Sequence, residues 1–293
     1  MDKRIDPPNP RKYTLFSIAH QKGISRDPGF HTHVHYEVFI FHQGKCTYLI
    51  DNKIYELLPG DMIVMDGSKL HKPSVLGDKN LYDRSIVQFS PEWIEPLLNF
   101  LQSDYLLDPF KKNHYTIYRT NNGEPTEDLI NLVVKIEDLL KLPVSLEKEN
   151  ELKVVVVELL LSIHKLHKYI ITDAAIILDE KNIYIQQIAT YIQNHYNKKI
   201  QLEDIEKEVN ISKSYLVHLF KEQTGYTIME YLMQYRLTQV LHLMKMYPNV
   251  SIKDLSNQCG FESEAHFSRF FKKNLGQSPS VFRKKLSEGE GIS

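Results

Sequence analysis

The chain contains one segment twice, as SKSYLVHLFKEQTG at residues 212–225 and as SEAHFSRFFKKNLG at residues 263–276. Aligned in register, the copies share a serine at the start, a Phe-Lys pair in the middle and a glycine at the end. Apolar side chains recur at helical spacing in both copies, so each predicts an amphipathic helix with one buried face. Two similar helical units are therefore expected to close the chain.

A short helical pattern precedes each copy, and a tight turn connects that short helix to the copy. The preceding segments are QLEDIEKEVN at residues 201–210 and SIKDLSNQCG at residues 251–260. The turns contain Asn210 and Gly260, residue types that tolerate a positive φ, as a helix-turn-helix requires. The sequence therefore predicts two helix-turn-helix units.

A long helix is expected to join these units, because Thr227 and Glu230 form a capping box ahead of a helical pattern that runs to about Met246. The faces opposite the two apolar stripes are free to touch a partner. They carry Ser214, Val217, His218 and Lys221 in the first copy, and Ala265, His266, Arg269 and Lys272 in the second. The alternative is a helical bundle whose outer faces are merely solvated.

Charge is distributed unevenly along the chain. Residues 181–293 carry 15 Lys plus Arg against 11 Asp plus Glu, whereas residues 1–180 carry 21 against 26, and the overall net charge of −1 conceals the difference. Two exposed helices at a fixed separation can enter successive major grooves of a duplex, about 34 Å apart. A basic tail with two such helices predicts double-stranded DNA as the partner.

The stretch from about Ile183 to Leu286 resembles the DNA-binding domain of AraC/XylS-type bacterial transcription regulators. Its second unit follows the family pattern GF-x-(S/D)-x-x-x-F-x-R-x-F-K-x-x-x-G-x-(S/T)-P. The matching residues are Gly260, Phe261, Ser263, Phe267, Arg269, Phe271, Lys272, Gly276, Ser278 and Pro279.

The resemblance also implies which residues face DNA. Carried over by position, the base- and phosphate-facing residues fall on Ser214, Val217, His218 and Lys221, and on Ala265, His266 and Arg269, and the predicted contacts also include Lys213, Ser263 and Lys272. Apolar Val217 and Ala265 could contact thymine methyl groups, while Arg269 could donate to a guanine edge.

Length and composition set the class of protein. A chain of 293 residues with 42 % apolar and 25 % charged residues predicts two folded domains. Cys46 and Cys259 fall in different domains, so no disulfide framework is expected. Because the start of the sequence lacks a signal-peptide pattern and no apolar run approaches about 18 residues, we expect a cytoplasmic protein without a membrane span.

Residues 10 to about 90 have a different pattern from the tail. Short runs rich in β-branched and aromatic residues alternate with turn-forming segments; the runs are YEVFIF, CTYLI, MIVM and SIVQF. This alternation predicts several antiparallel strands in a sandwich or barrel.

Three histidines and a carboxylate lie among these strands. His31, His33 and Glu37 share parity, so a regular strand would point all three to one face, and His71 follows a later strand. Their spacing resembles the two motifs of the cupin barrel, in which four such residues converge as a metal site. Asp66 and Ser68 replace the usual Pro and Gly of the second motif.

Two interpretations of this cluster remain open. Imidazole and carboxylate ligands suit Fe, Mn, Ni or Zn, so His31, His33, Glu37 and His71 could bind a divalent metal. In the AraC/XylS family the resemblance instead implies a pocket for a small-molecule effector, with sugars as the leading class. Aromatic side chains stack on sugar faces, and the candidates are Tyr13, Phe39, Tyr48 and Trp93, although Trp93 in a helical context is more often part of the core.

Residues 126–170 contain two apolar-periodic segments that predict a helical hairpin, with Pro143 ending the first helix and Ser145 preceding the second. By resemblance, this hairpin is expected to form an isologous homodimer. The alternative is that the hairpin packs only against its own barrel.

The sequence thus predicts a multi-domain α+β protein. The expected parts are a cupin-like effector domain at residues 1–125, the hairpin at 126–170, a linker at 171–182 and a double helix-turn-helix domain at 183–287. The predicted function is transcription regulation under the control of an effector, a carbohydrate, with RNA polymerase as a further partner. The alternatives are a metal-dependent cupin enzyme with a DNA-binding tail and a ligand-independent architectural protein.

Overall fold

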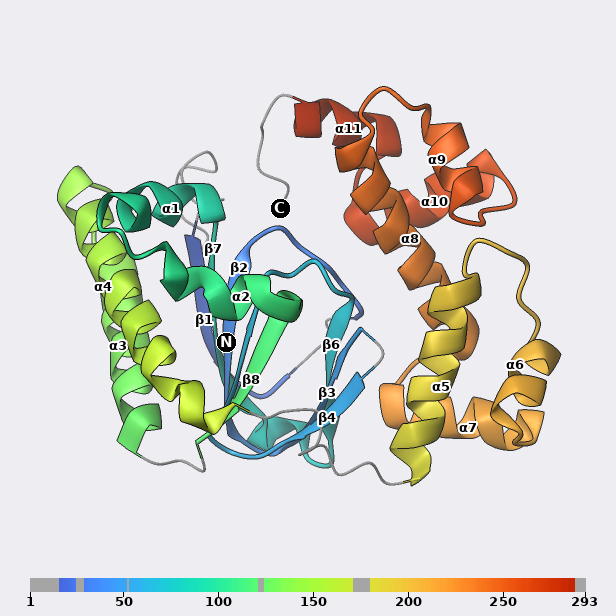
Figure 1. The fold of residues 1–293 in the computed structure, drawn as a ribbon, viewed down its shortest axis with the longest axis horizontal. Helices are drawn as coiled ribbons and strands as arrows, with labels where there is room; N and C mark the ends of the chain where they lie inside the picture. The colour runs from blue at the N-terminus through green and yellow to red at the C-terminus, as the bar shows by residue number, and fades with distance from the viewer. Residues whose placement is uncertain (1–15, 25–28, 52, 121–123, 171–179, 288–293) are drawn as a thin grey trace.

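A computed structural model describes residues 16–24, 29–51, 53–120, 124–170 and 180–287 (Figure 1). It shows a β domain, helices packed on one side of it and a helical C-terminal domain on the other side. The expected fold class is therefore confirmed. Among the described residues, no helix is long and apolar enough to cross a lipid bilayer.

The described strands form two antiparallel sheets that face each other. The larger sheet has the order β1-β7-β2-β5-β8, and the smaller has the order β4-β3-β6. The strands are β1 (Phe16–Lys22), β2 (Tyr36–Gln43), β3 (Lys45–Ile50), β4 (Lys53–Leu57), β5 (Asp61–Met65), β6 (His71–Leu76), β7 (Asp83–Phe89) and β8 (Tyr115–Arg119).

Alternation along the strands divides their side chains between separate cores, as the two-residue period of a strand requires. In β2, Phe39 and Phe41 point between the sheets, while Val38 and Ile40 point toward the covering helices. In β3, Tyr48 points inward, and the neighbouring Leu49 packs instead against the C-terminal domain. The smaller sheet is thus covered by the C-terminal domain.

Helices cover the outer face of the larger sheet. They are α1 (Pro91–Phe100), α2 (Asp108–Lys111), α3 (Glu124–Lys141) and α4 (Leu146–His164). Short 3-10 turns η2 (Asp104–Leu107), η3 (Lys112–His114) and η4 (Lys165–Tyr169) lie between or after these helices, and a further turn, η1 (Lys79–Leu81), connects β6 to β7. Helices α3 and α4 are the predicted hairpin, and Ser145 caps α4 by accepting a hydrogen bond from the Lys148 amide at 3.0 Å.

The C-terminal domain consists of α5 (Glu180–His195), α6 (Leu202–Val209), α7 (Lys213–Thr224), α8 (Ile228–Met246), α9 (Ile252–Gln258), α10 (Glu264–Leu275) and α11 (Pro279–Ser287). Pairs α6–α7 and α9–α10 are the two helix-turn-helix units, and each has its own apolar core. The turn residues Asn210 and Gly260 have φ values of 56° and 85°. The capping box of Thr227 and Glu230 starts the joining helix α8.

Two predicted boundaries differ from the structure. Helix α3 begins at Glu124, two residues before the expected start, because a proline at position 125 is tolerated in a first helical turn. Helix α5 begins at Glu180, whose carboxylate accepts a hydrogen bond from Tyr184 one turn later at 2.9 Å. Residues 171–179 of the expected linker lie outside the described residues.

Candidate nucleic-acid interface and ligand site

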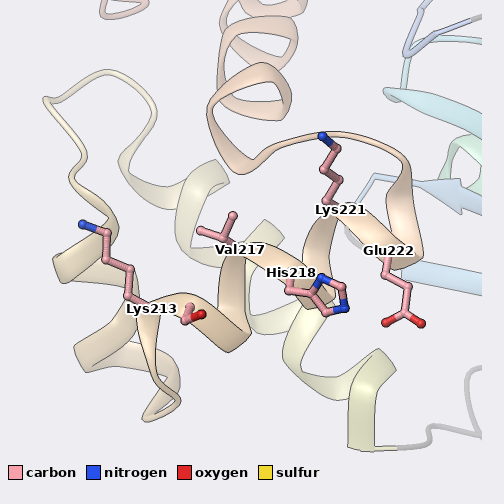
Figure 2. Close-up of a pocket in the computed structure, with 6 residues that line it drawn as sticks. Lys213, Val217, His218, Lys221 and Glu222 are labelled. Atoms are coloured by element: carbon pink, nitrogen blue, oxygen red, sulfur yellow. The ribbon is translucent and has the colours of Figure 1, made fainter.

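Helix α7 presents the first predicted reading surface. Its N-cap is Ser212, and its apolar residues Leu216, Leu219 and Phe220 are buried in the core of the first unit. On the opposite face, a shallow pocket is lined by Lys213, Ser214, Val217, His218, Lys221 and Glu222. Figure 2 shows Val217 and His218 between the outward-pointing side chains of Lys213 and Lys221. The acidic Glu222 on this surface was not among the predicted residues.

Helix α10 presents the second surface in the same way. Ser263 caps it by accepting a hydrogen bond from the His266 amide at 3.2 Å, and Phe267 and Phe271 are buried. Ala265, His266, Arg269 and Lys272 are all exposed. The Arg269 guanidinium donates from Nε to the Ala265 carbonyl at 3.3 Å, so its side chain lies along its own helix.

Lys213 is engaged within the domain. Its ammonium lies 2.5 Å from a carboxylate oxygen of Glu203 in α6, and its backbone amide donates to Glu206 at 3.0 Å. The hydrogen bond to Glu203 raises the pKa of Lys213. Contact of Lys213 with a phosphate would therefore compete with this ion pair. The sequence of α7 alone does not reveal this competition, because Glu203 lies in α6.

A buried arginine links the two units. Arg236 of α8 donates from Nε to the Tyr196 carbonyl and from Nη2 to the Lys198 carbonyl, each at 2.7 Å. A Cβ placed on Gly260 would lie 2.5 Å from the Tyr196 oxygen and 2.9 Å from Arg236 Nε. The turn of the second unit is thus packed onto the segment that follows α5, and sequence periodicity gave no sign of this contact.

In the β domain, the structure brings His31, His33 and His71 together, with one nitrogen from each ring within 4.8 Å of the others. His31 and His71 form an isolated antiparallel bridge, with backbone N–H···O distances of 3.2 and 3.1 Å. The prediction placed His33 by the alternation of a regular strand, but residues 32–35 do not form one. Its backbone amide donates to the Gly67 carbonyl at 3.0 Å, and a Cβ on Gly67 would lie 2.1 Å from the His33 ring.

Backbone carbonyls fix the orientation of all three rings. Nδ1 of His31 lies 3.0 Å from the Gly29 carbonyl, Nδ1 of His33 lies 3.0 Å from the His35 carbonyl, and Nδ1 of His71 lies 2.7 Å from the Lys69 carbonyl. Because a carbonyl only accepts, each Nδ1 carries the proton. Nε2 is therefore the ring nitrogen that each of the three histidines can offer as a ligand, and on His33 it also lies beside the Glu37 carboxylate.

The buried Nε2 of His71 has no hydrogen-bond partner within the described part of the chain. Burial lowers the pKa of His71 well below its usual value, and burial also lowers the pKa of His31. Both rings are therefore neutral at pH 7. Neutral imidazoles whose second nitrogen donates to a carbonyl are the usual form of metal-binding histidines, so these residues fit a divalent transition metal.

Glu37, the expected fourth ligand, is placed beside this group rather than in it. One carboxylate oxygen lies 3.0 Å from His33 Nε2 and 2.6 Å from the Gln88 amide nitrogen. Burial alone would raise the pKa of Glu37, but the hydrogen bond shared with His33 and the electrostatic interactions with the three histidines outweigh it and lower the pKa to about 2. Glu37 is therefore ionised beside the ligand nitrogen of His33, where its negative charge would favour a bound cation.

Of the aromatic candidates, Tyr13 lies outside the described residues, and the other three separate into two places. Tyr48 stacks near His71, with ring centroids 6.3 Å apart, and Phe39 lies 4.9 Å from Tyr48 inside the barrel. Trp93 lies in α1 on the other side of the larger sheet, 5.4 Å from Phe16 in the helix-covered core. The structure thus does not bring Trp93 to the histidines, because the apolar face of α1 turns it into that core.

A second group of potential metal ligands consists of His20, His42 and Asp83. His20 Nε2 lies 3.0 Å from Asp83, and His42 Nε2 lies 2.8 Å from the Ser85 hydroxyl. A bulge in β2 between Phe41 and Gln43 brings His42 to this group. These polar contacts satisfy the ring nitrogens that they use, so the group needs no ion.

Comparison with known proteins places this architecture in a family. A model of the AraC-like ligand binding domain matches residues 15–134, and a model of a helix-turn-helix domain matches residues 205–285. The chain belongs to the AraC family of transcription regulators. In this AraC-family protein, the first match contains the three histidines and the second contains both α7 and α10.

Relatives of this AraC-family protein include operon regulators. It is 27 % identical over 252 residues to the lactose operon transcription activator of Staphylococcus xylosus, a match that covers 84 % of this chain and 82 % of that protein. It is 36 % identical over 113 residues to the Msm operon regulatory protein of Streptococcus mutans, but this match covers 37 % of the chain and only 40 % of that protein.

Among solved structures, ToxT from Vibrio cholerae matches 93 % of this AraC-family chain and 99 % of its own, at 20 % identity and a TM-score of 0.38. The DNA-binding domain of AdpA in complex with a target DNA matches 36 % of the chain and 95 % of its own, at 20 % identity and a TM-score of 0.34.

Proposed function

We propose that this AraC-family protein binds specific DNA sequences and regulates transcription in response to a small-molecule effector. The observation that carries the proposal is the exposure of two matched helix faces, on α7 and α10, whose opposite faces are buried in separate cores. A helical bundle with solvated outer faces would not need two such faces, each on a helix with an N-cap that follows a tight turn. Two helices joined through α8 suit successive major grooves on one side of a duplex.

Each exposed residue has a proposed role that follows from its chemistry. Arg269 donates to a guanine edge, and Val217 and Ala265 contact thymine methyl groups. Lys221 and Lys272 neutralise phosphates, which fixes the register of the protein on DNA without reading bases. Ser214, His218, Ser263 and His266 add polar contacts to bases or phosphates along the same two faces.

The effector is proposed to be a carbohydrate that binds in the barrel near His31, His33 and His71. The regulators of the lactose operon and the Msm operon are named for operons, and the first name includes a sugar. Imidazole nitrogens and the Gln88 amide can hydrogen-bond sugar hydroxyls, and Tyr48 provides an aromatic face beside His71. A divalent metal at the same histidines is the second candidate ligand, supported by the unpartnered Nε2 of His71.

A homodimer is proposed through the α3–α4 hairpin. The hairpin buries one side against the β domain but leaves Val134, Leu146, Val154 and Leu161 exposed on the other. Leu146 and Val154 also line a groove with Lys135 and Glu151. An apolar face of this kind suits a twofold contact with the same face of a second copy. Contact with RNA polymerase remains a prediction from the family resemblance.

The relatives are named as regulators of operons rather than as enzymes, which favours regulation over metal-dependent catalysis. The decisive experiment selects bound duplexes from a random DNA pool with the full-length protein and then footprints the selected sequence. We expect protection on one face of the duplex in two adjacent major grooves, with altered affinity when a carbohydrate effector is added. Binding without sequence preference at a stated salt concentration would contradict the proposal.

A further inference from the structure

The docking contact between the β domain and the first helix-turn-helix unit lies next to the histidine site. Lys72 of β6 is buried, and its ammonium donates to the Thr224 carbonyl at 3.2 Å. The same ammonium lies 4.1 Å from the centroid of the Tyr226 ring. Thr224 is the last residue of α7, and carbonyls at a helix C-terminus attract cations. The β domain therefore contacts the C-terminal end of α7, while the DNA-facing surface of α7 stays exposed.

Phe30 makes the second part of this contact. Its ring lies 4.7 Å from the Tyr226 ring and 5.2 Å from the Tyr231 ring, and all three lie in the apolar cluster around the first unit. Phe30 and Lys72 are each one residue away from a histidine of the site, His31 and His71 respectively. The paired backbones of His31 and His71 thus carry the ligand site on one side and the docking contact on the other.

Further contacts fix the first unit on the smaller sheet. The Tyr231 hydroxyl donates to the Asp51 carbonyl at 2.8 Å, and the Gln193 amide donates to the Asp51 carboxylate at 2.9 Å. Figure 1 shows α5 beside β3 and β4, where these contacts lie. The second unit has a separate core with none of the β-domain residues in it. Docking therefore contacts the first reading helix directly, whereas no β-domain residue belongs to the core of the second unit.

We infer that a divalent transition metal held by His31, His33 and His71 stabilises the docked position of the first helix-turn-helix unit, through Phe30 and Lys72. This inference rests on the proposed function, since docking matters because it orients a DNA-reading head. Nitrogen ligands of a tetrahedral zinc ion at about 2.0–2.1 Å lie about 3.3 Å from one another. The candidate ligand atoms are within 4.8 Å, so binding would hold the two bridged backbones together.

Two-way coupling gives a direct test that uses no DNA. If metal binding favours docking, docking must favour metal binding by the same factor. Tyr226 belongs to the C-terminal domain and contacts Phe30 and Lys72, so Tyr226→Ala removes a docking contact while leaving the histidines in place. Tyr247→Ala is the matched control, because Tyr247 is an exposed tyrosine of the same domain. All variants are made in a His20→Ala background, which removes the second group of potential ligands.

The measurement is the affinity of the full-length protein for Zn²⁺ alone by calorimetry, with folding checked by circular dichroism. We expect one site that His71→Ala abolishes, about 5- to 150-fold weaker binding in Tyr226→Ala, and wild-type affinity in Tyr247→Ala. Equal affinities in Tyr226→Ala and the control would overturn the coupling. Lack of a His71-dependent site would overturn the choice of ligand. Should Tyr226→Ala fail to fold, Lys72→Met keeps the aliphatic stem and tests the same contact.

A distance measurement tests whether the metal stabilises the docked position of the first helix-turn-helix unit. Spin labels at exposed Lys79→Cys in the β domain and Glu222→Cys on α7 report the position of the first unit. We expect Zn²⁺ to narrow the distance distribution in the wild type and to leave it broad in Tyr226→Ala. A distribution that is unchanged by Zn²⁺ in the wild type would contradict the inference. Failure of the proposed DNA binding would appear instead in footprinting, which neither experiment uses.

Discussion

His71 and Lys72 are consecutive residues of β6, and their side chains reach opposite sides of the barrel wall. His71 lies inside, stacked near Tyr48, while Lys72 lies outside, against Tyr226 and the end of α7. The alternation of a strand makes this division unavoidable for neighbouring residues. A ligand on the inside is therefore only one peptide unit away from a contact that holds a reading helix.

The first prediction concerns base recognition by Arg269. Its guanidinium is exposed on α10, and its hydrogen bond within the described part of the chain is a weak one to its own helix, at 3.3 Å, so little is lost when it turns toward DNA. We expect Arg269→Ala to weaken binding to the selected sequence by about 1–3 kcal/mol and to relax one base position. Lys79→Ala removes a positive charge from the β domain and is the control. Unchanged affinity and specificity in Arg269→Ala would rule out the docking mode.

The second prediction compares two lysines on the α7 surface. Lys213 must leave Glu203 to reach a phosphate, whereas Lys221 has no such ion pair among the contacts of the described residues. We therefore expect Lys221→Ala to reduce the dependence of log affinity on log salt concentration by about 1, and Lys213→Ala to reduce it by less. Titrations at several salt concentrations measure both slopes. Equal slopes for the two variants would show that the ion pair does not compete with DNA.

The third prediction compares two glycines that share a left-handed backbone conformation. Gly260 and Gly276 have φ values of 85° and 71°, but only at Gly260 would a Cβ meet backbone, 2.5 Å from the Tyr196 carbonyl. Alanine at Gly276 is expected to lower the free energy of unfolding by about 1–2 kcal/mol for the left-handed backbone alone. Alanine at Gly260 should cost about 1–3 kcal/mol more, because it also forces the turn away from Arg236. Urea unfolding of both variants measures the difference, and equal losses would contradict the packing argument.

How much of the fold could be predicted depends on how far apart in the sequence the contacting residues lie. Asn210, Gly260 and the capping pair Thr227 and Glu230 act within a few residues, so sequence spacing was enough to place both helix-turn-helix units. The three histidines were also found by spacing, although the strand parity used for His33 was wrong. Gly67, which lies 34 positions later in the chain, places that ring instead.

The contacts that the sequence did not reveal join residues far apart in the chain. Lys72 and Thr224 are 152 positions apart, and Arg236 and Tyr196 are 40 apart. Helical and strand periods tell which face of an element is buried but not which element covers it. For the same reason Trp93 was a candidate for the ligand site, although the face of α1 that carries it turns to the other side of the sheet.

The fourth prediction concerns thiol reactivity. Cys46 and Cys259 are both free and buried, and burial raises the pKa of each to about 12. The thiolate is the reactive form, so neither residue should react with a disulfide reagent at pH 8 in the native protein, and both should react in denaturant. Because folding raises these pKa values, their contribution to stability is present below pH 9 and is lost as the pH rises toward 12. Rapid native labelling of either cysteine would contradict the burial.

The fifth prediction concerns the proposed dimer. Leu146 and Val154 are 72 % and 55 % exposed on the hairpin, where an apolar contact with a second copy would bury them. An aspartate at Val154 would place an unpaired charge in that contact, at a cost of several kcal/mol. We therefore expect Val154→Asp to be monomeric at concentrations where the wild type sediments as a dimer. Its free energy of unfolding as a monomer should change little, because the side chain does not belong to the core.

Phe100→Asp provides the control for this experiment. Phe100 is the most exposed of the large apolar residues in the described part of the chain, at 84 %, but it lies at the end of α1 rather than on the hairpin. Loss of the dimer in Val154→Asp but not in Phe100→Asp would assign the twofold contact to α3 and α4. A dimer that survives Val154→Asp would mean that the hairpin packs only on its own β domain. Paired half-sites on DNA would then have to be bound without the gain in effective concentration that a dimer gives.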